Sequence, residues 1–177
     1  VVLVEHNVEY ERLKAQITSL SDNSFQVLKH NELALCAQAD AVITVSDNDR
    51  ALLLRDGVDP RKVSTIPHGV DVAAFRTTAV IDVRARYGIA KDALLLVYHG
   101  PYSYAPNLQA MTVMARELLP RLEQRGLSVA VLAIGSKPPA QTLHPAIHFT
   151  GTVANLAEVL PAADLAVIPL LEGGGTR

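Results

Sequence analysis

The sequence lacks the features that mark membrane-spanning, disulfide-rich and nucleic-acid-binding proteins. It has one cysteine, Cys36, which cannot form an internal disulfide; this favours a reducing compartment, and we expect a cytoplasmic protein. The longest apolar runs are far too short to span a bilayer. A formal net charge of −2 gives no reason to expect a nucleic-acid partner. What remains is a chain with 49% hydrophobic residues, enough to fill a core.

Several common catalytic motifs are also missing. Neither GxGxxG nor GxxxxGK[ST] occurs, which excludes the dinucleotide fingerprint and the P-loop, and there is no GxSxG nucleophile elbow. His144 and His148 have the spacing of a helical zinc pair, but Pro145 lies between them and a strand-like run follows. We therefore expect no metal site.

Apolar, strand-like runs alternate with helical stretches along the whole chain. Continuous apolar runs are typical of parallel strands that are covered on both faces, so the alternation predicts open α/β sheets with right-handed crossovers. The predicted strands are Val1–Glu5, Ala41–Val45, Val63–Pro67, Leu94–His99, Ser128–Ile134, Ile147–Thr150 and Leu165–Leu170. The predicted helices are Glu9–Leu20, Phe25–Gln38, Asp47–Arg55, Val80–Tyr87, Pro106–Arg125 and Val153–Ala162.

The pattern breaks between Asp71 and Ala79, where no clear period is present. We predict two separate parallel sheets joined by an extended linker, in domains comprising residues 1–75 and 76–177. The chain opens inside a strand-like run, without Met, and stops directly after a glycine-rich segment. We therefore expect it to be a piece of a longer protein.

Candidate site residues follow the predicted strands, because ligands of open α/β sheets bind beyond the carboxyl ends of the strands. His6 follows the first strand and can accept a proton or orient a hydroxyl, or else belong to a turn or cap. A turn that contains His68, Gly69 and Asp71 follows the third strand. From the residues alone, either turn can be structural or functional.

Glycines follow the later strands. Gly100 comes after the fourth strand, near Tyr102 and Asn107, which can contact a polar ligand or only pack the loop. Gly135 ends the fifth. The chain ends in Gly173, Gly174, Gly175, Thr176 and Arg177. The backbone N–H groups of the glycines can converge on an anion, and the guanidinium of Arg177 can bind a phosphate through two hydrogen bonds.

Taken in order, five segments resemble the retaining glycosyltransferases of family four, also called glycosyl transferases group 1. They are Val2–Tyr10, Asp40–Ser46, Ile66–Asp71, Phe149–Val153 and Ala162–Pro169. In the third, His68 stands where the family usually has Asn. The resemblance implies the GT-B fold, α/β with two Rossmann-like parallel-sheet domains, both incomplete in this chain. Residues 1–75 would be the C-terminal part of the acceptor-binding domain, and residues 76–177 a truncated donor-binding domain.

By this resemblance the protein moves a sugar from a nucleotide-diphosphate donor to an acceptor hydroxyl with retention of configuration, without a metal or cofactor. His6 would be catalytic, and His68, Gly69 and Asp71 would line the hinge and cleft. The acceptor, whether a sugar, a lipid-linked compound or a small molecule, stays open. The donor would contact Gly100, Gly135, Thr152, Val153, Gly173, Gly174, Gly175, Thr176 and Arg177.

The chain departs from the family pattern in three ways. The first strands of the acceptor domain are missing, the Lys and Glu that usually follow Gly-Thr-Arg lie beyond the end, and Pro101–Tyr104 replaces a usual Arg/Lys pair. We therefore expect the chain to be inactive alone. Two alternatives are a GT-B nucleotide-sugar epimerase and a non-catalytic α/β binding module. Peripheral membrane contact through segments outside the chain stays open.

Overall fold

The structure, a computed structural model, describes residues 1–17 and 19–171. These residues form two compact units, Val1–Val70 and Asp71–Leu171, and each is described by itself. The division falls five residues before the boundary that we predicted between residues 75 and 76. The assignment of the two units to acceptor and donor stays a prediction.

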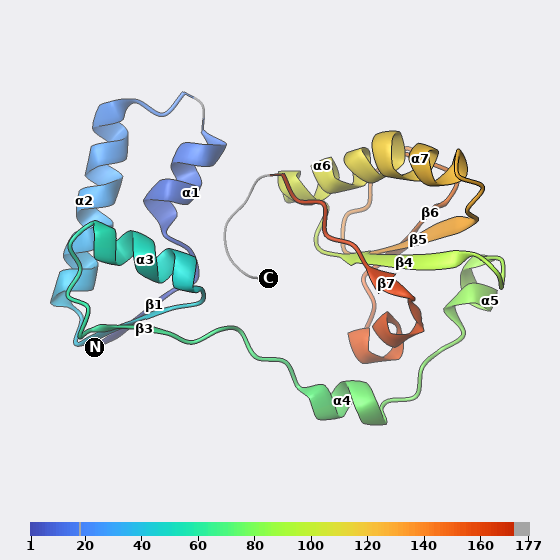
Figure 1. The fold of residues 1–177 in the computed structure, drawn as a ribbon, viewed down its shortest axis with the longest axis horizontal. Coiled ribbons are helices and arrows are strands. Elements are labelled where there is room, and N and C mark those ends of the chain that lie inside the picture. Colours follow the sequence, from blue (N-terminus) through green and yellow to red (C-terminus); the bar gives the residue numbers. More distant parts are fainter. Residues whose placement is uncertain (18, 172–177) are drawn as a thin grey trace. The chain divides into compact units, whose positions relative to one another are not determined.

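The first unit is a three-stranded parallel sheet with three helices (Figure 1). Its strand order is β1-β2-β3, and in its register Val4 lies opposite Ile43, which lies opposite Ser64. Because all three strands are parallel, their carboxyl ends lie at one edge. The elements are β1 (Val2–Glu5), α1 (Glu9–Gln16), α2 (Asp22–Gln38), β2 (Ala41–Thr44), α3 (Asp47–Arg55) and β3 (Val63–Thr65).

Local capping sets where helix α3 begins and ends. The Ser46 hydroxyl accepts a hydrogen bond from the Asp49 N–H at 3.1 Å, as expected of an N-cap at α3. Gly57, just after α3, adopts a left-handed φ of 95°, which glycine tolerates best. Helix α1 is different, because its own N-cap residue, Val8, makes no side-chain cap.

A carboxylate of α2 caps α1 instead. Glu32, which is buried, accepts hydrogen bonds from the N–H groups of Glu9 at 2.8 Å and Tyr10 at 3.0 Å. These N–H groups have no partner within their own helix, and a negative charge there is favoured by the helix dipole. Glu32 thus fixes the start of α1 to α2, and α1 follows the loop that carries His6.

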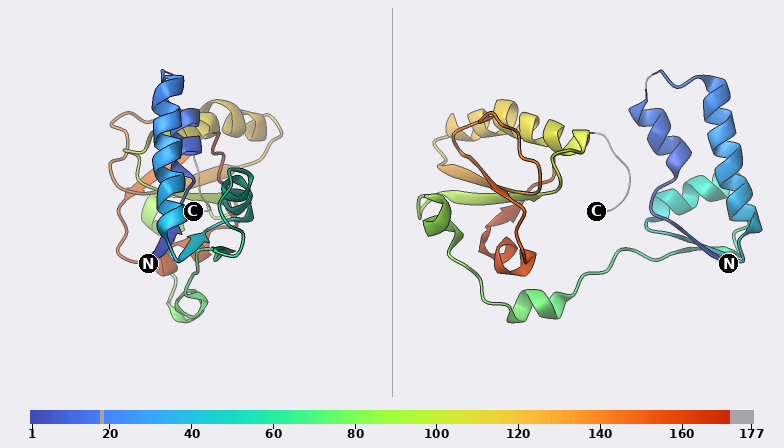
Figure 2. Two further views of the ribbon diagram at one scale, coloured as in Figure 1. Left: turned by 90° about the vertical axis from the view of Figure 1, so that its left-hand side faces the viewer. Right: turned by 180° about the vertical axis from the view of Figure 1, so that it is seen from behind.

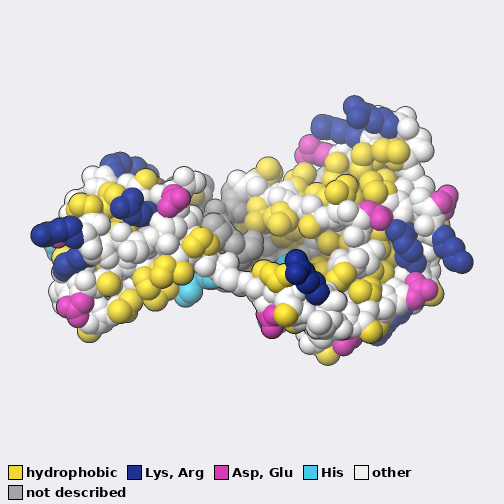
Figure 3. Space-filling model, turned by 60° about the horizontal axis from the view of Figure 1, so that its bottom comes forward, with side chains coloured by type: hydrophobic (Ala, Val, Ile, Leu, Met, Phe, Trp, Pro, Cys, Tyr) yellow, Lys and Arg dark blue, Asp and Glu magenta, His cyan; other side chains and the backbone are white. Residues whose placement is uncertain are grey.

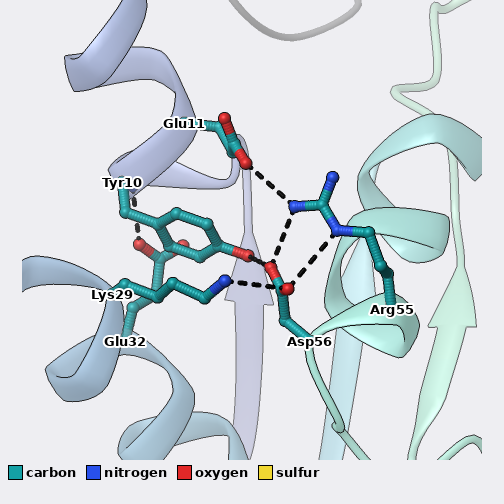
Figure 4. A network of polar contacts seen from close by, with 6 residues as sticks. All are labelled: Tyr10, Glu11, Lys29, Glu32, Arg55 and Asp56. Carbon is teal, nitrogen blue, oxygen red and sulfur yellow. Dashed lines mark hydrogen bonds and ion pairs between the residues drawn. The ribbon is translucent and has the colours of Figure 1, made fainter. Parts of the chain in front are cut away.

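A polar network centred on Asp56 ties the three helices together (Figure 4). Asp56 accepts a 2.5 Å hydrogen bond from the hydroxyl of Tyr10 and pairs with Lys29 at 2.8 Å. Arg55 donates to Asp56 at 3.0 Å and to Glu11 at 2.9 Å. These bonds, that from Arg55 foremost, hold the pKa of Asp56 well below its usual range.

The helices of the first unit cover one face of its sheet. Leu3, Val42 and Val63 point into the core beneath them. The residues that alternate with these face the other way, and Val2, Val4 and Ile66 are exposed by 59%, 46% and 55%. In Figure 3, where the underside of Figure 1 comes forward, hydrophobic side chains are visible on this unit. No described element of the first unit covers this face.

The second unit is a four-stranded parallel sheet in the order β6-β5-β4-β7 (Figure 1). Helices lie on both of its faces, as the reverse view in Figure 2 also shows. The elements are α4 (Val72–Thr77), α5 (Val83–Tyr87), β4 (Leu94–His99), α6 (Ala105–Val113), the π-helical turn η1 (Met114–Leu118), α7 (Leu119–Glu123), β5 (Val129–Ile134), β6 (Ile147–Gly151), the 3₁₀ turns η2 (Leu156–Glu158) and η3 (Leu160–Ala162), and β7 (Leu165–Ala166).

Strands β4 and β5 are apolar throughout because both of their faces are buried. Leu96 and Val131 pack under the α6–α7 layer, with Met111, Met114 and Leu119. The alternate residues, such as Leu95 and Leu132, pack against the other layer, which includes Val83 and Val159. The seven predicted strands thus form two separate parallel sheets, as predicted.

Four expectations about secondary structure were wrong in detail. The stretch predicted as an extended linker contains α4, and the last strand pairs only over Leu165–Ala166. The long helix is broken by η1 because Pro120 has no N–H to donate, and the ladder shifts to a bond from Leu119 to Met114. In place of a helix over residues 153–162 there are two 3₁₀ turns, Leu156–Glu158 and Leu160–Ala162, and before them Asn155 is extended and its side chain accepts a hydrogen bond from the Ala157 N–H.

Candidate functional site

The carboxyl edge of the first sheet brings together two histidines that were predicted for different roles. His6 directly follows β1, and His68 lies three residues beyond β3. Both side chains are exposed, and their rings stack with centroids 5.4 Å apart and planes inclined by 11°. Sequence reasoning missed this contact. The parallel order of three short strands was the signal that could have suggested it.

A buried carboxyl group lies directly beside His6 in the chain. Glu5 is 8% exposed, on the face of β1 that points into the core, and its carboxylate lies 3.9 Å from the Cys36 sulfur. Burial, followed by repulsion from Glu32, raises the pKa of Glu5 to about 7. This group is therefore partly protonated near neutrality, and sequence reasoning missed it because it occupies an ordinary strand position.

The remaining predicted residues of the hinge turn are structural or exposed. Asp71 accepts a 3.1 Å hydrogen bond from the Ala74 N–H and so caps α4. Gly69 is exposed and has open space around the position that a Cβ would take. Their assignment to a hinge or cleft stays a prediction.

In the second unit, the predicted glycines meet at the carboxyl edge of the sheet. Gly100 donates its N–H to the Ile134 carbonyl at 2.9 Å, and Gly135 donates to the Gly151 carbonyl at 3.0 Å. Thr152 and Val153 come next in the chain, with Thr152 exposed and Val153 half-buried. The strands β4, β5 and β6 thus end side by side at one edge, where ligands of open α/β sheets bind.

The approach of two loops at this edge requires glycine. A Cβ on Gly135 would lie 1.9 Å from the Gly100 carbonyl oxygen, and one on Gly100 would lie 2.6 Å from the Asn107 amide nitrogen. Asn107 is buried and holds the Gly100 loop: it donates to the Pro101 carbonyl at 2.8 Å and accepts from the Tyr98 hydroxyl at 2.6 Å.

The sequence left open whether Tyr102 and Asn107 contact a ligand or pack the loop, and in the structure both side chains pack the loop. Tyr102 is 4% exposed and packs edge-on against the ring of Phe149, with centroids 5.1 Å apart. Its hydroxyl has no hydrogen-bond partner among the described residues. Lys137, in the loop after β5, has a left-handed φ of 55° and lies beside the same edge.

The glycine-rich end of the chain lies outside the described residues. Gly173, Gly174, Gly175, Thr176 and Arg177 therefore stay predictions from the sequence. Within residues 1–17 and 19–171, no three His, Cys, Asp or Glu side chains converge on a point where a metal ion could bind. None of the helices in these ranges is long and apolar enough to cross a bilayer.

Two parallel-sheet units of this kind define the Rossmann-like class of α/β proteins. Comparison with known families matches residues 1–74 to Glycosyltransferase Family 4 and residues 93–177 to Glycosyl transferases group 1. The chain therefore belongs to the group 1, family four glycosyltransferases, and its fold is GT-B.

Curated relatives agree with the family. The D-inositol 3-phosphate glycosyltransferase of Geodermatophilus obscurus is 32% identical over 161 residues, which cover 78% of this chain and 34% of that protein. D-inositol 3-phosphate glycosyltransferase 2 of Catenulispora acidiphila is 28% identical over 148 residues, covering 74% and 35%. The chain thus spans about a third of the length of these relatives.

Solved structures share the fold at low sequence identity. WaaG, a glycosyltransferase of lipopolysaccharide biosynthesis, is 18% identical with a TM-score of 0.67, over 96% of this chain and 50% of that one. Anabaena Alr3699/HepE, solved in complex with UDP and glucose, is 16% identical with a TM-score of 0.64, over 93% and 45%.

The contact between Gly135 and Gly100 generates a stability prediction. In Gly135→Ala the new methyl group would collide with backbone, which cannot rotate away, so we expect the free energy of unfolding to fall by at least about 2 kcal/mol. Thermal and urea unfolding measure this. Gly69→Ala, which meets open space, is the matched control and should stay within about 0.5 kcal/mol of wild type. Equal stability of the two variants would contradict the close approach of the two loops.

The buried Glu5 generates a pH-dependent prediction. Its pKa rises from 4.5 to about 7 on folding, so the contribution of Glu5 to the free energy of unfolding is fully present below pH 4.5, is lost as pH rises to about 7 and is constant above. Glu5→Gln removes the charge and should raise the unfolding free energy at pH 8 by roughly 3 kcal/mol, with little change at pH 5.

Melting curves at the two pH values test this, with the exposed Glu117→Gln as control. Among the described residues Glu117 pairs with Arg121 alone, in a 3.7 Å surface ion pair, so its replacement should change stability little at either pH. A Glu5→Gln variant that is less stable than wild type at pH 8 would refute a raised pKa for Glu5.

Proposed function

We propose that the protein transfers a sugar from a nucleotide-diphosphate donor to an acceptor hydroxyl, with retention of configuration. Membership of the family supports the reaction class. The observation that carries the proposal is the carboxyl edge of the four-stranded sheet, where Gly100, Gly135 and Thr152 directly follow the adjacent strands β4, β5 and β6. HepE, which shares the fold, has been solved with UDP-glucose, and this supports a nucleotide sugar as donor.

On the donor side, the reaction needs groups that stabilise the charge of the departing diphosphate. We place the base and ribose near Gly135 and Thr152–Val153, and the diphosphate over Gly173–Thr176 beside Arg177. Backbone N–H groups and a guanidinium supply that stabilisation without a metal ion or other cofactor.

On the acceptor side, His6 is the group that we place at the reacting hydroxyl. Its ring is exposed at the carboxyl edge of the first sheet, where a ligand of a parallel sheet binds. An imidazole there can orient the hydroxyl or accept its proton. The acceptor class stays open, and nothing in the charge pattern favours a nucleic acid.

The whole protein, at its full natural length, is the species to which this proposal applies. The chain spans about a third of the length of its curated relatives, and we propose that the 177 residues alone are inactive. We place the reaction in the cytoplasm, since the single cysteine fits a reducing compartment.

The direct test of the reaction class is incubation of the protein at its full natural length with nucleotide sugars, with and without candidate acceptors. Acceptor-dependent release of the nucleoside diphosphate, with the anomeric configuration of the product read by NMR, supports a retaining transferase. Epimerised donor formed without acceptor would overturn the proposal in favour of a nucleotide-sugar epimerase. Absence of any nucleotide binding would overturn it in favour of a binding module.

Arg177 gives a sharp prediction on the donor side. A charge-assisted hydrogen bond to phosphate contributes about 1.5–3 kcal/mol, so Arg177→Ala should lower turnover by roughly ten- to a hundredfold and weaken donor binding. Arg177→Lys keeps the positive charge but cannot form the two parallel hydrogen bonds of a guanidinium, so turnover and donor binding should still be clearly impaired. Donor affinity by calorimetry and steady-state kinetics measure both effects. Near-normal values for both variants would remove Arg177 from the site.

His6 gives the matching prediction on the acceptor side. His6→Ala should lower turnover by roughly a hundredfold or more while donor affinity changes little, because the group acts on the acceptor hydroxyl. The exposed His30→Ala on α2 is the control for loss of an imidazole elsewhere on the same unit. Normal turnover in His6→Ala would exclude the catalytic assignment while leaving the donor site untouched.

A further inference from the structure

The two stacked histidines are held in place from separate elements of the first unit. The row Glu5, Thr44 and Thr65 ends the paired part of the three strands. His6 is the next residue after β1, and the loop beyond it is closed by Val8, 2% exposed, and by the capped start of α1. His6 is thus anchored on both sides within a few residues.

His68 is anchored independently. The Ile66 N–H donates to the Thr44 carbonyl at 2.8 Å and so extends the pairing of β3 with β2 by one residue. Pro67 follows with a fixed φ, and His68 comes next. Strands lie about 4.8 Å apart, so β1 and β3 are separated by roughly 10 Å at this edge. The two imidazoles bridge the width of β2, with ring centroids 5.4 Å apart and planes only 11° from parallel.

The stack restricts rotation of each ring while leaving both exposed. An exposed histidine on a loop ordinarily samples several side-chain rotamers, and only some of these point a ring nitrogen at a bound hydroxyl. A parallel ring placed against its face favours a subset of them. His6 can therefore be held in one orientation and still be reached by a substrate.

We infer that His68 is a positioning residue for His6: its ring holds the His6 imidazole in the orientation in which it meets the acceptor. This inference rests on the proposed function, because it gives His6 the acceptor-side role. It assigns to His68 an action through another side chain, distinct from a contribution to a hinge. Since the ring face makes the contact, an aromatic ring without nitrogen can replace His68, whereas a small side chain cannot.

The experiment compares His68→Phe and His68→Ala in the protein at its full natural length, with His30→Ala as control. Stacking of an aromatic pair corresponds to a factor of roughly two to ten. We expect His68→Ala to lower kcat by about that factor with the KM for donor unchanged, and His68→Phe to retain most of the wild-type kcat. His68 is exposed, so the melting temperatures of both variants should match wild type.

NMR of the imidazole protons supplies a readout that does not depend on activity. In wild type the His6 ring signals should carry a ring-current shift, which His68→Ala removes and His30→Ala leaves unchanged. Loss of the shift together with the lower kcat supports the inference. Equal kcat losses in His68→Phe and His68→Ala would overturn it, since they would assign the effect to the nitrogens of His68. Normal kcat in His68→Ala, or no change in the His6 signals, would also overturn it.

These outcomes separate the inference from the proposed function. If wild type transfers sugar but His68→Ala has normal kcat, the positioning role fails and the transferase stands. If wild type turns over no donor with any acceptor, the proposed function fails and the positioning role falls with it. The NMR comparison would then still report whether the two rings are in contact.

Discussion

Parallel pairing of every strand is the constraint on which the rest of the structure depends. In a parallel sheet, all strands end at the same edge, so residues that are far apart in sequence but follow strands become neighbours. In the first unit this places His6 and His68 together, and in the second it places Gly100 against Gly135. The same constraint demands crossover helices, which cover both faces of β4 and β5 and make those strands apolar throughout.

The sequence predicted the fold well because its periodicities agree with the tertiary structure. β4 is paired over the full predicted range Leu94–His99, and α3 has the predicted bounds with Ser46 as its cap. Prediction failed where a single residue decided the outcome. Pro120 turned a regular helix into a π-helical turn, and an Asp71 cap created α4 in a stretch without a clear apolar period. Such local hydrogen bonds leave little trace in a hydrophobic pattern.

The sequence predicted which strand ends carry the candidate residues but not the contacts that these residues make, and their role in a site stays a prediction. A glycine after a strand indicates a close approach, and Gly100 and Gly135 do lie at the shared edge, yet no sequence pattern indicated that the Gly100 backbone excludes a side chain at Gly135. The sequence left open whether Asn107 contacts a polar ligand or only packs the loop. Its bonds to Tyr98 and Pro101 assign it to the loop, because a buried amide must be satisfied internally. Such contacts depend on the register in which neighbouring strands pair, and the hydrophobic pattern of the sequence does not specify this register when the order of the strands is unknown.

Two buried carboxyl groups beneath the His6 loop show how the first unit supports an exposed side chain. Burying Glu32 is costly and raises its pKa, and the cost is only partly offset by the two N–H bonds that it accepts at the start of α1, where Val8 offers no cap. Among the described residues, Glu5 has no comparable partner besides the Cys36 thiol at 3.9 Å, and the nearby charge of Glu32 adds to the rise in its pKa that burial causes. Fixing α1 through Glu32 therefore makes Glu5 harder to ionise. The loop with His6 connects the end of β1, where Glu5 lies, to the start of α1, which Glu32 of α2 holds. The bonds that fix the start of α1 to Glu32 thus come with a loss of stability at Glu5 wherever both carboxyl groups are ionised.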